Sequence, residues 1–197
     1  MADNGSYSLL LLAGGRSSRM GTDKADLLYG GKTFLAHMLS KAHALKIEKC
    51  FISGYPTLRS NVRSVPDQFP DRGPLGGIHA GMKAMDTPYC LVLPIDAPLL
   101  PIGVLESLLR AHRESTEKDK VLIWEHGDRK EPLIAIYPTA MAEMIGELIC
   151  DRPVPVFRAL DRIGYDCCLI EIDEAEIINV NTPELYEKLL KGAGDTQ

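Results

Sequence analysis

The sequence predicts an α/β fold with a mostly parallel, twisted sheet between two layers of helices. Residues 7–13 form a continuous apolar run that stops at two adjacent glycines, which is typical of a strand buried on both faces of a parallel sheet. Residues 33–45 then place apolar side chains at helical spacing. A strand, a glycine-rich loop and a helix in this order open a doubly wound, Rossmann-like sheet.

The rest of the chain continues this alternation. Apolar runs predict further strands at residues 49–53, 61–65, 90–95, 121–124, 133–137 and 167–172. Helical spacing predicts further helices at residues 76–85, 99–112, 140–149, 154–160 and 182–190. We expect Pro101 to lie in the first turn of its helix, and the polar residues 126–130 to form a turn between two strands.

Nothing in the sequence divides the chain, so residues 1–197 are expected to form one domain with loose tails at 1–7 and 191–197. The net charge of -5 argues against a protein that binds nucleic acid or anionic lipid through a basic face. The apolar runs are far shorter than the roughly 20 residues that span a bilayer, and no secretion signal is visible. We therefore expect a cytoplasmic protein.

The strongest motif follows the first strand and reads LAGGRSSRMGTDK at residues 12–24. Its two adjacent glycines let the backbone approach a ligand closely, and its hydroxyls, two arginines and a lysine bring donors together around an anion. A triphosphate is the natural occupant. The spacing matches neither the P-loop nor the dinucleotide fingerprint. The alternative is a glycine turn followed by a solvated basic loop.

A carboxylate follows the strand predicted at residues 90–95. This residue, Asp96, is followed by Ala97 and Pro98. An acid at the carboxyl edge of an open parallel sheet can hold Mg²⁺ between the protein and bound phosphates. The alternative is a cap at the N-terminus of the next helix. The glycine loop elsewhere in the sequence favours the metal.

Two further segments carry polar groups that fit a ligand. Residues 66–77 form a loop rich in glycine and proline, which could wrap a base or ribose while Asp67 reaches the metal or the sugar; a plain surface turn is the alternative. Near the C-terminus, Asn179 and Asn181 point the same way from an extended segment and would present two amides. Capping of the last helix by Asn181 or Thr182 is the alternative there.

These motifs resemble the MobA family of molybdenum cofactor guanylyltransferases, whose opening has the form LAGGxSxRMGxDKxxL. Residues 12–24 match that opening, and Asp67 with residues 73–77 match a loop that ends in GPLxG. Asp96 and Pro98 match a strand that ends in an aspartate, and residues 179–184 match a terminal NVNTPE. The four blocks follow the family's order and span nearly the whole chain.

The resemblance implies a role for each matched residue. The nucleotide would be contacted by Leu12, Ala13, Gly14, Gly15, Lys24, Asp67 and Asp96. The catalytic residues would be Lys24, Arg19 and Asp96, with Arg19 near the phosphates and Asp96 holding Mg²⁺. The side chains of Asn179 and Asn181 would face the pterin. The implied reaction is attack by the terminal phosphate of molybdopterin on the α-phosphorus of GTP, which releases pyrophosphate and leaves a guanine dinucleotide.

Two departures from the family pattern leave the base open. Ile95-Asp96-Ala97 replaces the usual Cys-Asp-Thr or Cys-Asp-Met, and Ser53-Gly54-Tyr55 stands where an NxN is common. The alternatives are a molybdopterin cytidylyltransferase, a sugar-phosphate nucleotidyltransferase on the same fold, and a non-catalytic GTP-binding protein that delivers the cofactor. The second glycine of the opening gives room for a purine and favours GTP. Molybdoenzyme apoproteins and a small GTP-binding helper protein are the protein partners to expect.

Overall fold

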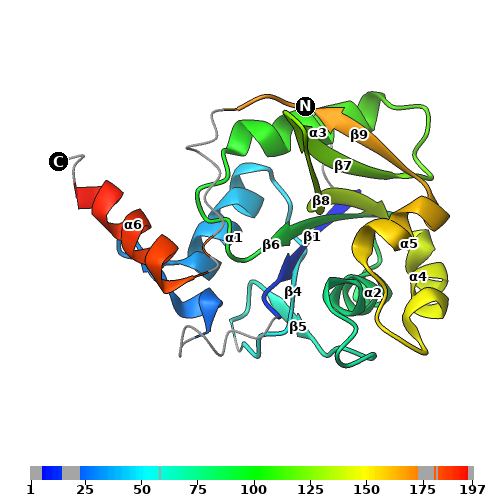
Figure 1. Cartoon of the computed structure of the whole chain (residues 1–197), viewed down its shortest axis with the longest axis horizontal. Helices are drawn as coiled ribbons and strands as arrows, with labels where there is room; N and C mark the ends of the chain where they lie inside the picture. Colours follow the sequence, from blue (N-terminus) through cyan, green and yellow to red (C-terminus); the bar gives the residue numbers. More distant parts are fainter. Residues whose placement is uncertain (1–5, 15–22, 58, 173–179, 181, 195–197) are drawn as a thin grey trace.

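A seven-stranded sheet forms the centre of the computed structural model, which describes residues 6–14, 23–57, 59–172, 180 and 182–194 (Figure 1). The strand order is β5-β4-β1-β6-β8-β7-β9. The strands are β1 (Tyr7–Leu12), β4 (Cys50–Ser53), β5 (Arg63–Val65), β6 (Tyr89–Pro94), β7 (Val121–His126), β8 (Arg129–Pro138) and β9 (Tyr165–Leu169). Neighbouring strands from β5 to β6 run parallel, β8 is antiparallel to both β6 and β7, and β9 is parallel to β7.

Helices cover both faces of this sheet (Figure 1). One face packs against α1 (Phe34–Ala44), α3 (Ile102–Glu114) and α6 (Pro183–Gly194). The other packs against α2 (Pro74–Ala84), α4 (Ala142–Ile149) and α5 (Val156–Ile163). In β1, Leu9 and Leu11 point into the first layer and Leu10 into the second, each at most 1% exposed. The three-layer α/β prediction is therefore confirmed.

Helix α2 lies directly on the sheet because two glycines face it. A Cβ on Gly81 would lie 2.5 Å from a methyl group of Leu10, and a Cβ on Gly77 would lie 2.8 Å from the Ser53 hydroxyl. Real Cβ atoms do not approach other atoms so closely, so a side chain at either position would displace Leu10 or Ser53. The close approach holds the start of α2 against the carboxyl ends of β1 and β4.

The structure corrects several predicted boundaries. Pro101 is the N-cap of α3 and does not lie in its first turn. Strands β7 and β8 are longer than predicted, so only residues 127–128 separate them. Helix α2 begins two residues earlier than predicted, α5 spans Val156–Ile163, and β9 ends at Leu169. Both tail boundaries were wrong, since β1 already includes Tyr7 and α6 continues to Gly194.

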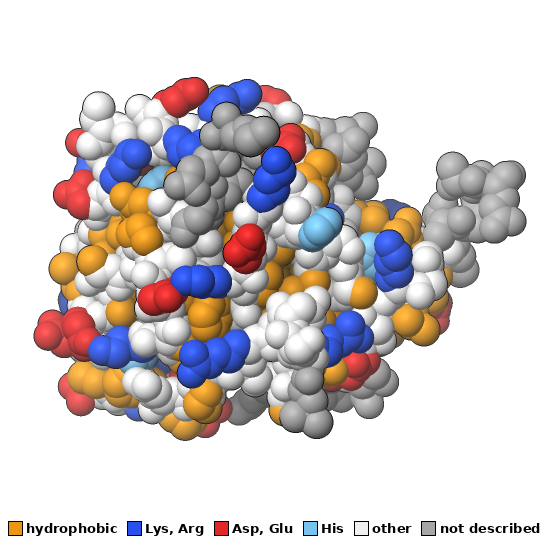
Figure 2. Space-filling model, turned by 180° about the vertical axis from the view of Figure 1, so that it is seen from behind, with side chains coloured by type: hydrophobic (Ala, Val, Ile, Leu, Met, Phe, Trp, Pro, Cys, Tyr) orange, Lys and Arg blue, Asp and Glu red, His pale blue; other side chains and the backbone are white. Residues whose placement is uncertain are grey.

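Three short elements had no counterpart in the sequence predictions: the 3₁₀ helix η2 (Lys24–Asp26) and the two hairpin strands β2 (Leu28–Tyr29) and β3 (Lys32–Thr33). The 3₁₀ helix η3 (Thr139–Met141) overlaps the start of the helix predicted at residues 140–149. In the described part of the chain no helix has the length and apolarity to cross a bilayer. On the face shown in Figure 2, basic and acidic side chains are interspersed, as the modest net charge suggests.

Candidate functional site

The carboxyl ends of the parallel strands meet at one edge of the sheet, and four chain segments come together there. Leu12 at the end of β1 pairs with Ser53 of β4 on one side and with Pro94 of β6 on the other. The backbone N–H of Val180, far along the chain, donates to the carbonyl of Asp96 at 2.9 Å. This edge therefore joins the start of the opening motif to three of the other segments that the sequence singled out.

The centre of the edge is an ion pair between two predicted site residues. Lys24 Nζ donates to Asp96 Oδ2 at 2.8 Å, and each side chain is 16% exposed. Lys24 opens η2, which the Asp23 carboxylate caps by accepting from the Ala25 N–H. Helix α3 instead begins at Ile102 with Pro101 as its N-cap and no side-chain cap, so the capping role for Asp96 was wrong.

Two glycine backbones touch at the same edge, just after β1 and β4. Gly54, directly after β4, has a φ of +79°, and a Cβ there would lie 2.2 Å from Gly14 Cα. Only glycine satisfies both conditions. The departure at residues 53–55 therefore places a glycine where two loops make backbone contact. Next to it, the Tyr55 hydroxyl donates to Asp26 at 2.7 Å, and this hydrogen bond raises the pKa of Tyr55.

Asp67 lies at the same edge, after β5. Its Oδ1 accepts from the Phe69 N–H at 2.9 Å, and a Cβ on Gly76 would lie 2.7 Å from its Oδ2. The carboxylate is thus hydrogen-bonded within its own loop and packs closely against the first turn of α2. The structure brings Asp67 to the edge two strands away from β1, whereas Lys24 and Asp96 contact each other directly.

Four predicted site residues, Gly15, Arg19, Asn179 and Asn181, lie outside the described residues. Beside the last of them, the Thr182 hydroxyl accepts from the Leu185 N–H at 3.3 Å. This contact supports the helix-cap role for Thr182.

One residue at this edge was missed by the sequence predictions. Glu131 near the start of β8 is half-buried; burial is the largest cause that raises the pKa of its carboxyl, and the charge of Asp96 adds to it. The only signal in the sequence was an acid directly before Pro132 and an apolar run. Because that run was predicted to begin at Leu133, Glu131 was left without an assignment between the turn and the strand.

The metal-ligating groups at this edge fit a metal ion that the protein and a bound substrate hold together. Within the described residues no cluster of three or more His, Cys, Asp or Glu side chains could hold a metal ion alone. Asp96 offers one partly exposed carboxylate. Magnesium in phosphoryl-transfer sites is held by one or two carboxylates together with the substrate's phosphates. The chemistry of the site therefore fits Mg²⁺ bound jointly with a nucleotide.

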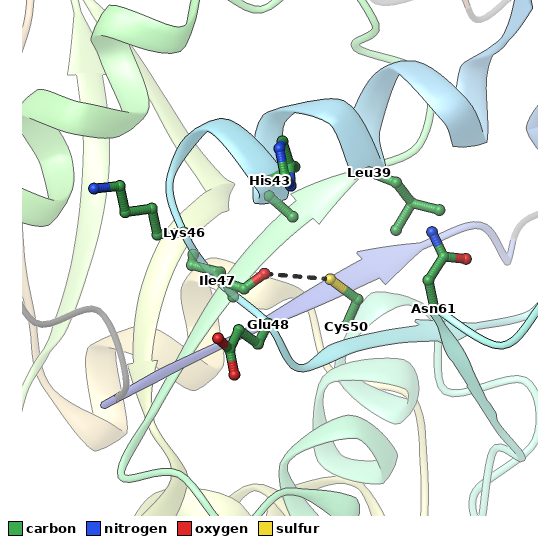
Figure 3. A pocket seen from close by; sticks show the side chains of 8 residues that line it. Leu39, His43, Lys46, Ile47, Glu48, Cys50 and Asn61 are labelled. Atoms are coloured by element: carbon green, nitrogen blue, oxygen red, sulfur yellow. Dashed lines mark hydrogen bonds between the residues drawn. The ribbon is translucent and has the colours of Figure 1, made fainter.

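A cavity of about 410 Å³ lies elsewhere, near the amino end of β4 (Figure 3). It is lined by Leu39, Ala42, His43, Lys46, Ile47, Glu48, Cys50 and Asn61. Strand β4 begins at Cys50 and reaches the ion-pair edge only at its other end. This cavity is separate from the candidate site.

Comparison with known proteins gives three kinds of match. Residues 9–163 match the family model of the MobA-like NTP transferase domain. A probable molybdenum cofactor guanylyltransferase of Rhodopirellula baltica is 34% identical over 185 residues, covering 88% of this chain and 87% of the relative. A molybdenum cofactor guanylyltransferase of Pseudomonas fluorescens is 33% identical over 190 residues, covering 91% and 92%.

Solved structures share the fold. Molybdopterin-guanine dinucleotide biosynthesis protein A from Archaeoglobus fulgidus superposes with a TM-score of 0.76 at 22% identity, covering 96% of this chain and 100% of that one. A 2-C-methyl-D-erythritol 4-phosphate cytidylyltransferase from Thermus thermophilus has a TM-score of 0.68 at 16% identity, covering 95% and 98%. The same architecture thus serves proteins named for different bases.

Proposed function

The chain belongs to the MobA-like NTP transferase family, and from this premise we propose that it is a molybdenum cofactor guanylyltransferase. In the proposed reaction an oxygen of the terminal phosphate of molybdopterin attacks the α-phosphorus of GTP. The bond from the α-phosphorus to the oxygen that bridges to the β-phosphorus breaks, and pyrophosphate leaves. The guanylyl group stays on molybdopterin through the new phosphoanhydride bond.

The ion pair between Lys24 and Asp96 is the observation that carries this proposal. The two residues are 72 positions apart in the sequence, and the fold joins them at the edge where nucleotides bind in open α/β sheets. When a triphosphate binds, the ammonium of Lys24 would turn to its phosphate oxygens. The charge of Lys24 would then hold the phosphates in line for attack and offset the negative charge that gathers during transfer.

We propose Mg²⁺ as the cofactor, held by the Asp96 carboxylate together with the phosphates of GTP. When bound, the ion would supply Lewis-acid neutralisation of phosphate charge. Asp96 would orient this charge, and Lys24 would add a second cation. Arg19 is proposed to lie near the phosphates as a third.

The remaining site residues are assigned to the two substrates. Residues 12–15 and Asp67 would contact the nucleotide, and Asn179 and Asn181 would face the pterin. The names of the relatives support GTP as the donor. Molybdoenzyme apoproteins that receive the product, and a small GTP-binding helper protein, are proposed partners that a pull-down can test.

Pyrophosphate release tests the proposal. GTP, CTP and ATP are supplied in turn with Mg²⁺, each with and without molybdopterin. We expect release only from GTP and only when molybdopterin is present. Release from CTP would move the chain to the cytidylyltransferase activity. Tight GTP binding without any release would favour a protein that delivers the cofactor without making it.

A further inference from the structure

The β7–β8 hairpin carries polar side chains that the proposed mechanism leaves without a role. His126 ends β7, and Arg129 and Glu131 lie at the start of β8. In the hairpin register His126 is opposite Arg129, and Glu131 is opposite Trp124. Because side chains alternate along a strand, all four lie on one face. We refer to His126, Arg129 and Glu131 as the hairpin cluster.

The topology brings this cluster to the edge that holds Asp96. Strand β8 runs antiparallel to β6, so its start lies at the carboxyl end of β6. The last register pair joins Val92 to Ala135. Asp96 lies four residues after Val92, and Glu131 lies four residues before Ala135, so both lie beyond the same end of the paired region. The charge of Asp96 is among the causes that raise the pKa of the Glu131 carboxyl, in agreement with this placement.

The cluster lies on the opposite side of Asp96 from the proposed nucleotide residues. The strand order is β5-β4-β1-β6-β8-β7-β9. The glycine contact and Asp67 follow β1, β4 and β5, whereas the hairpin cluster lies on β8 and β7. The second substrate must approach the α-phosphate at Asp96 from the side opposite the nucleotide. It would therefore lie over the hairpin.

A shift in register places Glu131. Ile123 pairs with Ala135, but the next residue, Trp124, already pairs with Glu131, so residues 132–134 have no partner on β7. The buried Tyr137 hydroxyl donates to the Pro132 carbonyl at 2.8 Å and holds this bulge. Bulges next to active sites re-aim side chains. Without the shift, Glu131 would not lie opposite Trp124.

A buried nitrogen in the same cluster lacks a partner. His126 is 3% exposed and stacks on Trp124 with ring centroids 4.7 Å apart. Its Nε2 has no hydrogen-bond partner in the described part of the chain. His126 is a diagonal neighbour of Glu131 across the hairpin, within roughly 7–8 Å at the backbone. A buried unpaired polar atom is costly, so this nitrogen suits a ligand that completes it.

We propose that the hairpin cluster binds the acceptor, and that Glu131 is its specificity-determining residue. This inference rests on the proposed function. The acceptor combines a phosphate monoester with a heterocycle rich in N–H donors, and a carboxylate accepts hydrogen bonds from such donors while repelling phosphate. Glu131 therefore contacts the heterocycle, and the exposed cation of Arg129 offsets the acceptor's negative charge.

Glu131→Gln tests this assignment against a matched control, Glu125→Gln. Glu125 is one residue from Trp124 and therefore points to the other face of the hairpin, where Lys130 lies opposite it. For each variant, kcat and the KM for molybdopterin are measured, together with GTP affinity and the binding of Mn²⁺ by electron paramagnetic resonance. We expect Glu131→Gln to raise the KM for molybdopterin about tenfold, in line with one lost charged hydrogen bond.

The measurements of GTP affinity and Mn²⁺ binding distinguish an acceptor contact from a metal ligand. GTP affinity and Mn²⁺ binding stay within about twofold of wild type if Glu131 contacts the acceptor. An unchanged KM for molybdopterin overturns the proposal, and so does a loss of Mn²⁺ binding, which would make Glu131 a metal ligand. If Glu131→Gln does not fold, Glu131→Asp against Glu125→Asp carries the same comparison. Failure of the wild type to use GTP and molybdopterin would instead overturn the proposed function.

Discussion

Two lysine–aspartate ion pairs of nearly equal length lie at opposite edges of the sheet. Lys24 and Asp96 are 2.8 Å apart at the carboxyl edge, and each side chain is 16% exposed. Lys49 and Asp86, just before β4 and β6, are 2.7 Å apart at the amino edge, with side chains 51% and 73% exposed. The contact distances match, and the surroundings differ.

The difference shows that surroundings decide what such a pair can do. An exposed pair stays hydrated and screened, so it contributes little to stability. A pair that is mostly withdrawn from water has lost hydration on both charges, so each charge gains when a ligand offers it a new partner. A triphosphate with its cation offers one partner to each. We therefore expect changes at the carboxyl edge to alter activity, and changes at the amino edge to alter stability.

The sharpest test of this division is Asp96→Asn. Removing the carboxylate that is proposed to hold Mg²⁺ should lower kcat about a thousandfold, in the range for loss of one preorganised charge contact. The variant should still unfold cooperatively in a urea titration, because asparagine keeps the size of the side chain and an oxygen that can accept from Lys24. Asp86→Asn is the matched control and should leave kcat unchanged. Near-normal turnover by Asp96→Asn would remove the basis of the catalytic assignment.

The next largest effect is expected at the amino edge, where His112 is buried among aromatic rings. Its Nδ1 is hydrogen-bonded to the Tyr7 hydroxyl at 2.8 Å, and its ring lies 4.4 Å from that of Tyr89. Burial lowers the pKa of His112 from its ordinary 6.5 to about 4. The unfolded chain therefore takes up a proton at a higher pH than the folded chain does.

It follows that stability is full above pH 6.5 and falls as the pH drops from 6.5 towards 4, by up to about 3 kcal/mol from this residue. Urea unfolding between pH 4 and pH 7 measures the loss. In His112→Gln the slope should flatten, while GTP affinity at pH 7 stays the same. His43→Gln, an exposed histidine, serves as the control. An unchanged slope in His112→Gln would assign the acid sensitivity to another group.

Much of the fold was predictable because burial leaves a direct mark on the sequence. The run at residues 7–13 is apolar except for Ser8, since β1 is covered on both faces. The hairpin was less predictable for the opposite reason. Arg129 and Lys130 are exposed at the start of β8, and an exposed strand end has the same composition as a turn. Periodicity therefore could not distinguish the two.

The site was predictable residue by residue, but its contacts were not. Lys24 and Asp96 stand out in the sequence, yet their meeting depends on the pairing of β1 with β6 across more than 70 residues. The position of Glu131 depends on a register shift that no local pattern encodes. Contacts that arise from strand pairing are visible only in the structure.

Gly54 lies at the carboxyl edge, but we expect Gly54→Ala to alter both stability and activity. The new methyl group would meet Gly14 Cα at 2.2 Å, at a φ of +79° that side chains rarely adopt. We expect a loss of about 2 kcal/mol in the free energy of unfolding, together with weaker GTP binding. Gly103→Ala in α3, where no atom lies within 4 Å of the new Cβ, should be neutral or stabilising by up to about 1 kcal/mol. Equal effects at both glycines would refute the requirement for close backbone contact.

The smallest effect compares the two lysines directly, by the affinity for GTP of Lys24→Ala and Lys49→Ala. Removing the ammonium beside the proposed phosphate site should raise the Kd for GTP at least about tenfold, the cost of one charge-assisted hydrogen bond. Lys49→Ala removes the same charge from the far edge, where about 8 Å of screening length at physiological salt leaves little long-range attraction. Its Kd should stay within about twofold of wild type in calorimetric titrations. If both variants weaken GTP binding equally, overall charge attracts the nucleotide, and the partly buried ion pair of Lys24 and Asp96 has no special part in holding it.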